Sequence, residues 1–146
     1  MHMLHDAGDR QAIVARIRSL RAESPRQWGR MTIDQMLWHV NQGLLMAVED
    51  LPVAAASSPL PRPLMKWLVL RACWPKGAPT FPEFVARASY EFEPGQVALL
   101  QSLETFAGRD LTESWPRHPG LGTMTGRDWS CLMHKHLDHH LRQFST

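Results

Sequence analysis

The sequence has few cysteines, no long apolar run and almost no net charge, and each of these shortages excludes a class of protein. Two cysteines in 146 residues, Cys73 and Cys131, are too few for a disulfide framework, and we interpret both as small buried apolar residues. The longest apolar stretch, 64–70, is interrupted by Lys66 and falls far short of the ~20 residues that cross a bilayer. A formal charge of +2 without a basic block gives no electrostatic footprint for a nucleic acid.

The remaining composition is that of one ordinary folded domain. The chain is 44% hydrophobic and 21% charged, which is typical of globular proteins and far from the composition of disordered chains. A length of 146 residues is the size of one domain. No basic and apolar leader opens the sequence. We therefore expect a single domain over residues 1–146, located in the cytoplasm, with neither a membrane nor a nucleic acid as partner.

Four segments have the apolar spacing of amphipathic helices, and they predict an all-α four-helix bundle. The expected helices cover residues 9–21, 32–48, 94–108 and 125–143. Two of them begin with the same capping pattern: Thr32 and Thr125 are N-caps, and Gln35 and Asp128 complete a capping box three residues later. An additional short helix, largely buried, is expected over 64–74.

Long connecting loops are expected between these helices. Four prolines and a run of small residues make 52–63 a connector. The segment 75–93 sustains no period, although 84–87 could form a helical turn and 86–92 could be extended. Irregular segments of this length inside a small domain are usually functional or cover something, so this segment, through Arg87, is a candidate for substrate contact.

Histidine is unusually abundant: the chain has eight, and four of them fall between residues 134 and 140. Residues four apart share one face of an α-helix, so His136 and His140 can present ring nitrogens to a single ion. Random placement of eight histidines gives on the order of 0.4 such pairs, so the spacing alone is a weak signal. The pair also borders the apolar stripe of its helix, where a neutral imidazole needs partners for both nitrogens.

His39 is the candidate for a third metal ligand. It is the only other histidine in an expected long helix, and it lies beside that helix's apolar stripe, with Gly43 one turn away leaving space for a cavity next to the imidazole. Three imidazoles from two helices, with a fourth position open, are typical of catalytic zinc. The alternatives are a core-edge imidazole bonded to the backbone for His39, and ordinary packing for the pair His136 and His140.

The other polar candidates are placed around this site. His134 and His139 point away from the face of His140, so we expect them to be solvated or to support the ligands from outside. His118 is expected in a loop, with the alternative that it lines a cleft. Gln143 lies one turn beyond His140 and is a candidate for orienting that ring.

Two motifs carry a resemblance to a known family. Residues 36–39 read Met-Leu-Trp-His, and residues 136–143 read His-Leu-Asp-His-His-Leu-Arg-Gln. Together they resemble the DinB-like (DinB/YfiT) superfamily of metalloenzymes, whose last helix typically carries a His-x-x-His-His run followed closely by Gln. Further motifs, at 28–31, 74–77 and 139–144, resemble its branch of domains of unknown function. The resemblance covers about residues 13–144.

The resemblance implies a four-helix bundle with a divalent metal ion held by His39, His136 and His140, and a homodimer. The ending His-His-Leu-Arg-Gln departs from the His-His-Arg-Gly-Gln that is typical elsewhere in the superfamily. We therefore predict a metal-dependent enzyme, with zinc or nickel activating water or a low-molecular-weight thiol, and a transferase or hydrolase reaction on a small molecule. The alternative is a non-catalytic dimeric helical-bundle module that binds a partner.

Overall fold

The computed structural model describes residues 1–49, 51 and 53–146, and this part of the chain is all-helical, as predicted. The elements in chain order are α1 (Ala7–Ser19), α2 (Ile33–Glu49), α3 (Arg62–Arg71), the 3-10 turn η1 (Pro82–Phe84), α4 (Phe92–Gly108) and α5 (Gly126–Gln143). Within the described residues no strand forms, and one isolated backbone bridge joins His118 and Gly122. None of the described helices combines the length and apolarity needed to cross a membrane.

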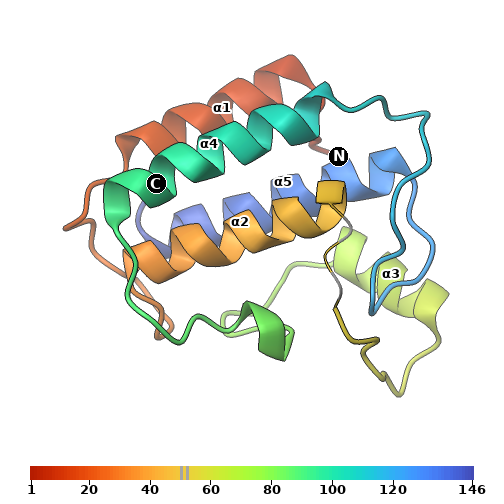
Figure 1. Ribbon diagram of the computed structural model, residues 1–146. Coiled ribbons are helices and arrows are strands. Elements are labelled where there is room, and N and C mark those ends of the chain that lie inside the picture. Colours follow the sequence, from red (N-terminus) through yellow and green to blue (C-terminus); the bar gives the residue numbers. More distant parts are fainter. Residues whose placement is uncertain (50, 52) are drawn as a thin grey trace.

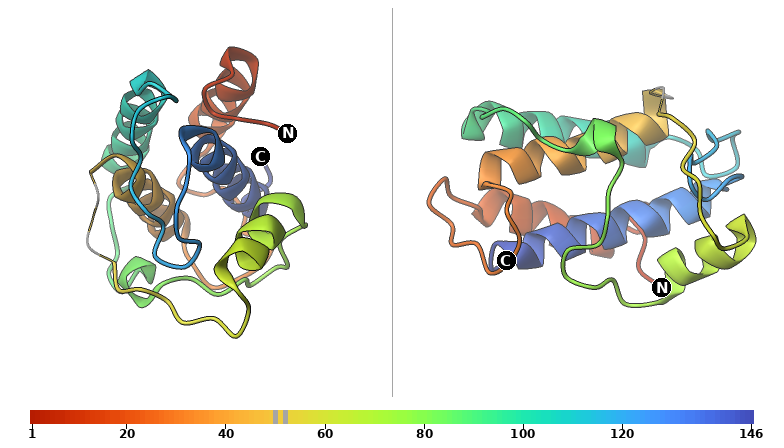
Figure 2. Two further views of the ribbon diagram at one scale, coloured as in Figure 1. Left: turned by 90° about the vertical axis from the view of Figure 1, so that its right-hand side faces the viewer. Right: turned by 90° about the horizontal axis from the view of Figure 1, so that it is seen from below.

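The four long helices lie side by side, and α3 packs outside them (Figure 1). α2 packs along α4 and α5, and α1 packs along the same two helices, so the contacts close into a ring. The end-on view in Figure 2 shows these four helices around a shared interior, where Trp129 and Phe106 are the largest fully buried side chains. This closed ring of contacts is compatible with the expected four-helix bundle.

Capping hydrogen bonds set the start of the two helices that carry the candidate ligands. At α5 the Thr125 hydroxyl accepts from the Asp128 N–H at 3.1 Å, and the Asp128 carboxylate accepts from the Thr125 N–H at 2.9 Å. At α2 the Gln35 side chain accepts from the Thr32 N–H at 3.1 Å. N–H groups at a helix start lack partners within the helix, and these bonds supply partners there. The helices begin at Ile33 and Gly126, directly after Thr32 and Thr125, so both predicted starts are confirmed.

The short helix α3 differs most from its prediction. It was expected over 64–74 and largely buried, but it ends at Arg71, and Leu64 and Trp67 are 44% and 58% exposed. α3 packs against one other helix, α5, so only one edge of its apolar surface is covered. The prediction for Cys73 is wrong for the same reason: it follows α3 at the surface and is exposed, whereas Cys131 is buried in α5.

Other helix ends shift by about two residues. α1 begins at Ala7 because the carboxylate of Asp6 accepts from the N–H of Asp9 and so caps the helix earlier than expected. α4 begins two residues before Pro94, whose missing N–H would have no intrahelical partner in the first turn. The helical turn expected over 84–87 is wrong in its position, because the 3-10 turn η1 covers Pro82–Phe84 and residues 85–87 are not helical. The predicted end of α2 involves Asp50 and Pro52, which lie outside the described residues.

A buried and an exposed residue on α4 test this packing. Leu99 is fully buried and Val97 is 53% exposed. Leu99→Ala should lower the free energy of unfolding by about 2–5 kcal/mol, because it leaves a cavity, and Val97→Ala by less than about 0.5 kcal/mol. Urea denaturation of both variants measures the difference, and equal losses would contradict the orientation of α4.

Candidate metal centre

Three histidines that the sequence singled out lie around one point between α2 and α5. Ring nitrogens of His39, His136 and His140 lie within 4.8 Å of one another. The three pairs of ring centroids are 4.8–4.9 Å apart, and the ring planes are inclined by 72–83° in each pair. Rings inclined in this way bring their edges, which carry the nitrogens, towards a common point. The structure thus brings the three candidate ligands together. Metal binding by these histidines stays a prediction.

His39 is buried, 3% exposed, and a backbone group sets its tautomer. Its Nδ1–H donates to the carbonyl of Phe84 at 2.8 Å, in the turn η1. The other nitrogen, Nε2, is then unprotonated and lies 3.0 Å from Nε2 of His136. Both alternatives considered for His39 therefore describe one ring: Nδ1–H is bonded to the backbone, and the unprotonated Nε2, which accepts from Nε2–H of His136, has the lone pair that a metal ion would need.

Gly43 provides the space that His136 occupies. A Cβ at position 43 would lie 3.1 Å from Nδ1 and 3.2 Å from Cε1 of His136. The prediction of a cavity beside His39 is wrong, because the imidazole from α5 fills that space. Two nitrogens that bind one tetrahedral zinc ion at 2.0–2.1 Å lie about 3.3 Å apart, close to the separation of the His39 and His136 nitrogens.

His140 is oriented through Gln143, one turn further along α5. Its Nδ1–H donates to Oε1 of Gln143 at 3.0 Å, which leaves Nε2 of the ring free. Gln143 is 3% exposed, and its own Nε2–H donates to the carbonyl of Trp28 at 2.8 Å. The next residue, Gly29, has φ +82°, and a Cβ there would overlap the amide nitrogen of Gln143. The loop before α2 therefore requires glycine here in order to hold Gln143 in place.

Burial lowers the pKa of all three histidines. Desolvation lowers the pKa of His39 although its bond to Phe84 opposes the shift, and desolvation together with the neighbouring His39 lowers the pKa of His140 to about 3. The pKa of His136 falls well below its usual value, through burial first and then the nearby His140. All three rings are neutral at pH 7, which is the state in which imidazole binds a metal ion.

An aromatic rim, formed by Trp28, Trp74 and His139, lies against the rings of His136 and His140. The ring of His139 is 5.1 Å from and perpendicular to that of His140, and it lies 5.9 Å from Trp28 and 5.7 Å from Trp74. The ring of Trp74 is also 6.0 Å from that of His136. Of the two alternatives for His139, the structure favours support of the ligands from outside.

His134 belongs to a separate cluster with His2 and Asp9. The rings of His134 and His2 stack at 5.1 Å with an interplanar angle of 22°, and the Asp9 carboxylate lies 2.6 Å from Nδ1 of His2. These three residues also offer ligand atoms within 4.8 Å of one another. Here, however, the ring faces rather than the nitrogen-bearing edges approach each other, and the side chain of His2 is 76% exposed.

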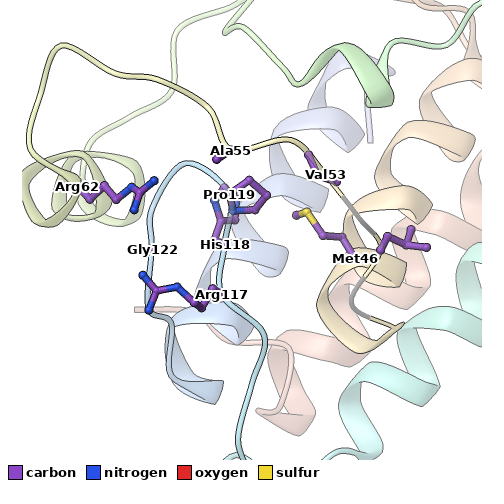
Figure 3. A pocket seen from close by; sticks show the side chains of 9 residues that line it. Met46, Val53, Ala55, Arg62, Arg117, His118, Pro119 and Gly122 are labelled. Atoms are coloured by element: carbon purple, nitrogen blue, oxygen red, sulfur yellow. The ribbon is translucent and has the colours of Figure 1, made fainter.

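His118 lies in the loop before α5 and lines a cavity of about 360 Å³ (Figure 3). Its Nδ1 accepts from the N–H groups of Gly120 and Leu121 at 3.1 and 3.2 Å. Burial lowers the pKa of His118 to about 4. Both expectations for this residue, a loop position and the lining of a cleft, are confirmed.

The sequence analysis missed the groups that hold the ligand rings. The segment 75–93 reaches the site through the backbone carbonyl of Phe84, whereas Arg87 is exposed and its contact with a substrate stays a prediction. A backbone carbonyl leaves no trace in a sequence pattern. Trp28 and Gly29, which hold Gln143, belong to the motif at 28–31, but the sequence analysis assigned no role to them. The signal for that role was a glycine directly after a tryptophan.

Comparison with known families assigns the chain to a family without a described activity. It belongs to the family described as "Protein of unknown function (DUF1569)", whose profile matches residues 3–146. No curated protein and no solved structure matched the chain. The family's description does not name the DinB/YfiT superfamily, so that resemblance stays a prediction.

Two glycines allow a matched test of the support for His140. Gly29 and Gly77 both have positive φ, +82° and +79°, but a Cβ at Gly77 meets nothing within 4 Å. Gly29→Ala should displace Gln143 and weaken zinc binding by about 10–100-fold, because His140 loses its fixed acceptor. Gly77→Ala carries a similar backbone strain and should leave zinc affinity unchanged. Competition with a chromophoric chelator measures both, and equal losses would contradict the role of Gln143.

The low pKa of His118 predicts acid sensitivity. An unfolded histidine has a pKa near 6.5, so between about pH 6.5 and 4 the unfolded chain takes up a proton that the folded state resists, and stability falls as the pH falls. His118→Asn keeps an acceptor for the two N–H groups but does not titrate. Between pH 7 and 5 the wild type should lose about 1–2 kcal/mol more than this variant in urea denaturation. Identical losses would show that His118 does not titrate as described.

Proposed function

We propose that the protein is a metal-dependent enzyme of the DinB/YfiT type, a four-helix bundle that binds a divalent ion through His39, His136 and His140. The observation that carries this proposal is the convergence of three neutral imidazoles whose nitrogens lie within 4.8 Å of one another. Two of the rings have Nδ1–H groups fixed by acceptors, at Phe84 and Gln143, so each directs a free Nε2 inwards. Three histidines with an open position are typical of catalytic zinc.

The composition of the cluster supports a catalytic rather than a structural site. Among the described residues, no cysteine, aspartate or glutamate joins the three histidines, as a closed structural site would require. His136 and His140 remain partly exposed, so a small molecule can approach from their side. A fourth position can therefore be filled by a ligand from outside the chain.

The proposed chemistry is the activation of a nucleophile. A divalent ion held by three imidazoles lowers the pKa of a water or thiol and so supplies a nucleophile near neutral pH. The chain keeps the three rings neutral, and it fixes their direction through Phe84 and Gln143. We propose zinc or nickel as the ion, since imidazole suits both, and a transferase or hydrolase reaction on a small molecule with a low-molecular-weight thiol as co-substrate. A homodimer is the proposed assembly.

Metal analysis tests the site directly. Protein purified without a tag or chelator should contain about one divalent ion per chain. His136→Ala should lower the affinity for zinc by at least about 100-fold, because one of three ligands is lost. His134→Ala, on the same helix but outside the cluster, should keep the metal. Inductively coupled plasma mass spectrometry and a chelator competition give content and affinity.

Two results would contradict the proposal. If His134→Ala loses the ion and His136→Ala keeps it, the ion lies in the cluster with His2 and Asp9. If the wild type binds no metal, the non-catalytic binding module is favoured instead. With metal bound, a panel of low-molecular-weight thiols and electrophilic acceptors tests transferase activity, and His136→Ala should abolish it.

A further inference from the structure

Two arginines converge on the cavity that His118 lines. Arg62 stands at the start of α3 and Arg117 in the loop before α5, and both line this cavity. Figure 3 shows their guanidinium groups beside the loop at Gly122. A Cβ at Gly122 would lie 3.4 Å from Cδ of Arg62 and 3.9 Å from Nη2 of Arg117. The missing side chain at this position therefore leaves room for both cationic side chains next to the loop at Gly122.

No described carboxylate balances these two charges. None of the described residues that line the cavity is acidic, and none of the described carboxylates forms an ion pair with Arg62 or Arg117. Lys66, which lines the adjoining pocket, is by contrast paired with Asp128 at 2.7 Å. Like charges placed close together repel each other, and an anion between them would replace the repulsion with attraction.

The loop that carries Arg117 is held in a fixed shape. His118 and Gly122 exchange two backbone hydrogen bonds, at 2.8 and 2.9 Å, and Gly122 has φ +79°, which favours glycine. Nη1 of Arg117 donates to the hydroxyl of Thr123 at 2.8 Å. The guanidinium is thereby anchored at one nitrogen, and its remaining donors are available to a ligand.

His118 adds a neutral donor to the cavity. Its Nδ1 accepts two backbone N–H groups, so the ring proton resides on Nε2. In the described part of the chain, Nε2 has no hydrogen-bond partner. The opposite wall is apolar and includes Met46 and Val53. A cavity of this volume that combines charged, polar and apolar lining residues can hold a small molecule with an acidic group and an apolar part.

We propose that this cavity binds the anionic group of a small molecule, a carboxylate or a phosphate, with Arg62 and Arg117 as the charged contacts and His118 as a neutral donor. Its position relates it to the metal centre. Met46 lies seven residues after His39 on α2, and Trp129, whose ring is 5.4 Å from that of His118, lies seven residues before His136 on α5.

Seven helical residues span about 10 Å, so Met46 and Trp129 lie about 10 Å along their helices from His39 and His136. If the metal centre is catalytic, this small molecule is its substrate, and that step alone rests on the proposed function. The binding of the anion itself depends on the arginines and not on a metal.

The test is anion binding by the metal-free protein. Isothermal titration with inorganic phosphate and, separately, with succinate distinguishes the two acid groups. Arg62→Gln and Arg117→Gln should each weaken binding by about tenfold or more, because each removes a charge-assisted contact. Arg71→Gln removes an exposed charge from the other end of α3, outside the cavity lining, and should bind like the wild type. The imidazole NMR signals of His118 should shift on binding.

Three outcomes would overturn the proposal. One is that neither anion binds to the metal-free protein, and another is that all three variants weaken binding equally, which would indicate general surface attraction. The third is binding that requires the metal-loaded protein and persists in Arg62→Gln and Arg117→Gln, which would place the anion on the ion. Because the titration uses metal-free protein, a failure to bind the anion is distinguishable from a failure to bind the metal. Thermal unfolding of each variant verifies that it is folded.

Discussion

The hydrogen bonds that the Nδ1–H groups of His39 and His140 donate are the interactions on which the rest of the candidate site depends. A neutral imidazole carries one proton, and the atom that holds it decides which nitrogen is free. The carbonyl of Phe84 and the side chain of Gln143 hold the protons of His39 and His140 on Nδ1, so both Nε2 atoms are available. Without these acceptors the buried rings could exchange tautomers, and the shared point between them would not be defined.

One of these acceptors, and the group that holds the other in place, come from segments outside the four long helices. Phe84 lies in the turn η1, and Gln143 is held by the carbonyl of Trp28 in the loop between α1 and α2. The helices supply the spacing of the ligands, and the loops supply their direction. A long irregular connection in a small domain thus has a structural explanation here, because it places one polar backbone atom next to a buried ring.

The parts of the fold and site that the sequence could predict are those set by local physics. The start of α5 follows from Thr125 and Asp128, and the approach of His136 and His140 follows from the pitch of one helix. The partly exposed position of α3 and the role of Phe84 could not be predicted, because both depend on which elements pack together over long distances in the chain. Likewise, the placement of Arg62 and Arg117 beside Gly122 joins the start of α3 to the loop before α5, which share no sequence pattern.

The bond between Gln143 and Trp28 joins residues 115 positions apart, and the contact between His39 and His136 joins residues 97 positions apart. Contacts of such high sequence separation form late, after the loops between them have been closed. A chain emerging from the ribosome cannot assemble this triad until α5 has been synthesised. Occupancy of the triad by an ion would therefore report that α2 and α5 have packed together, and metal loading would follow that packing.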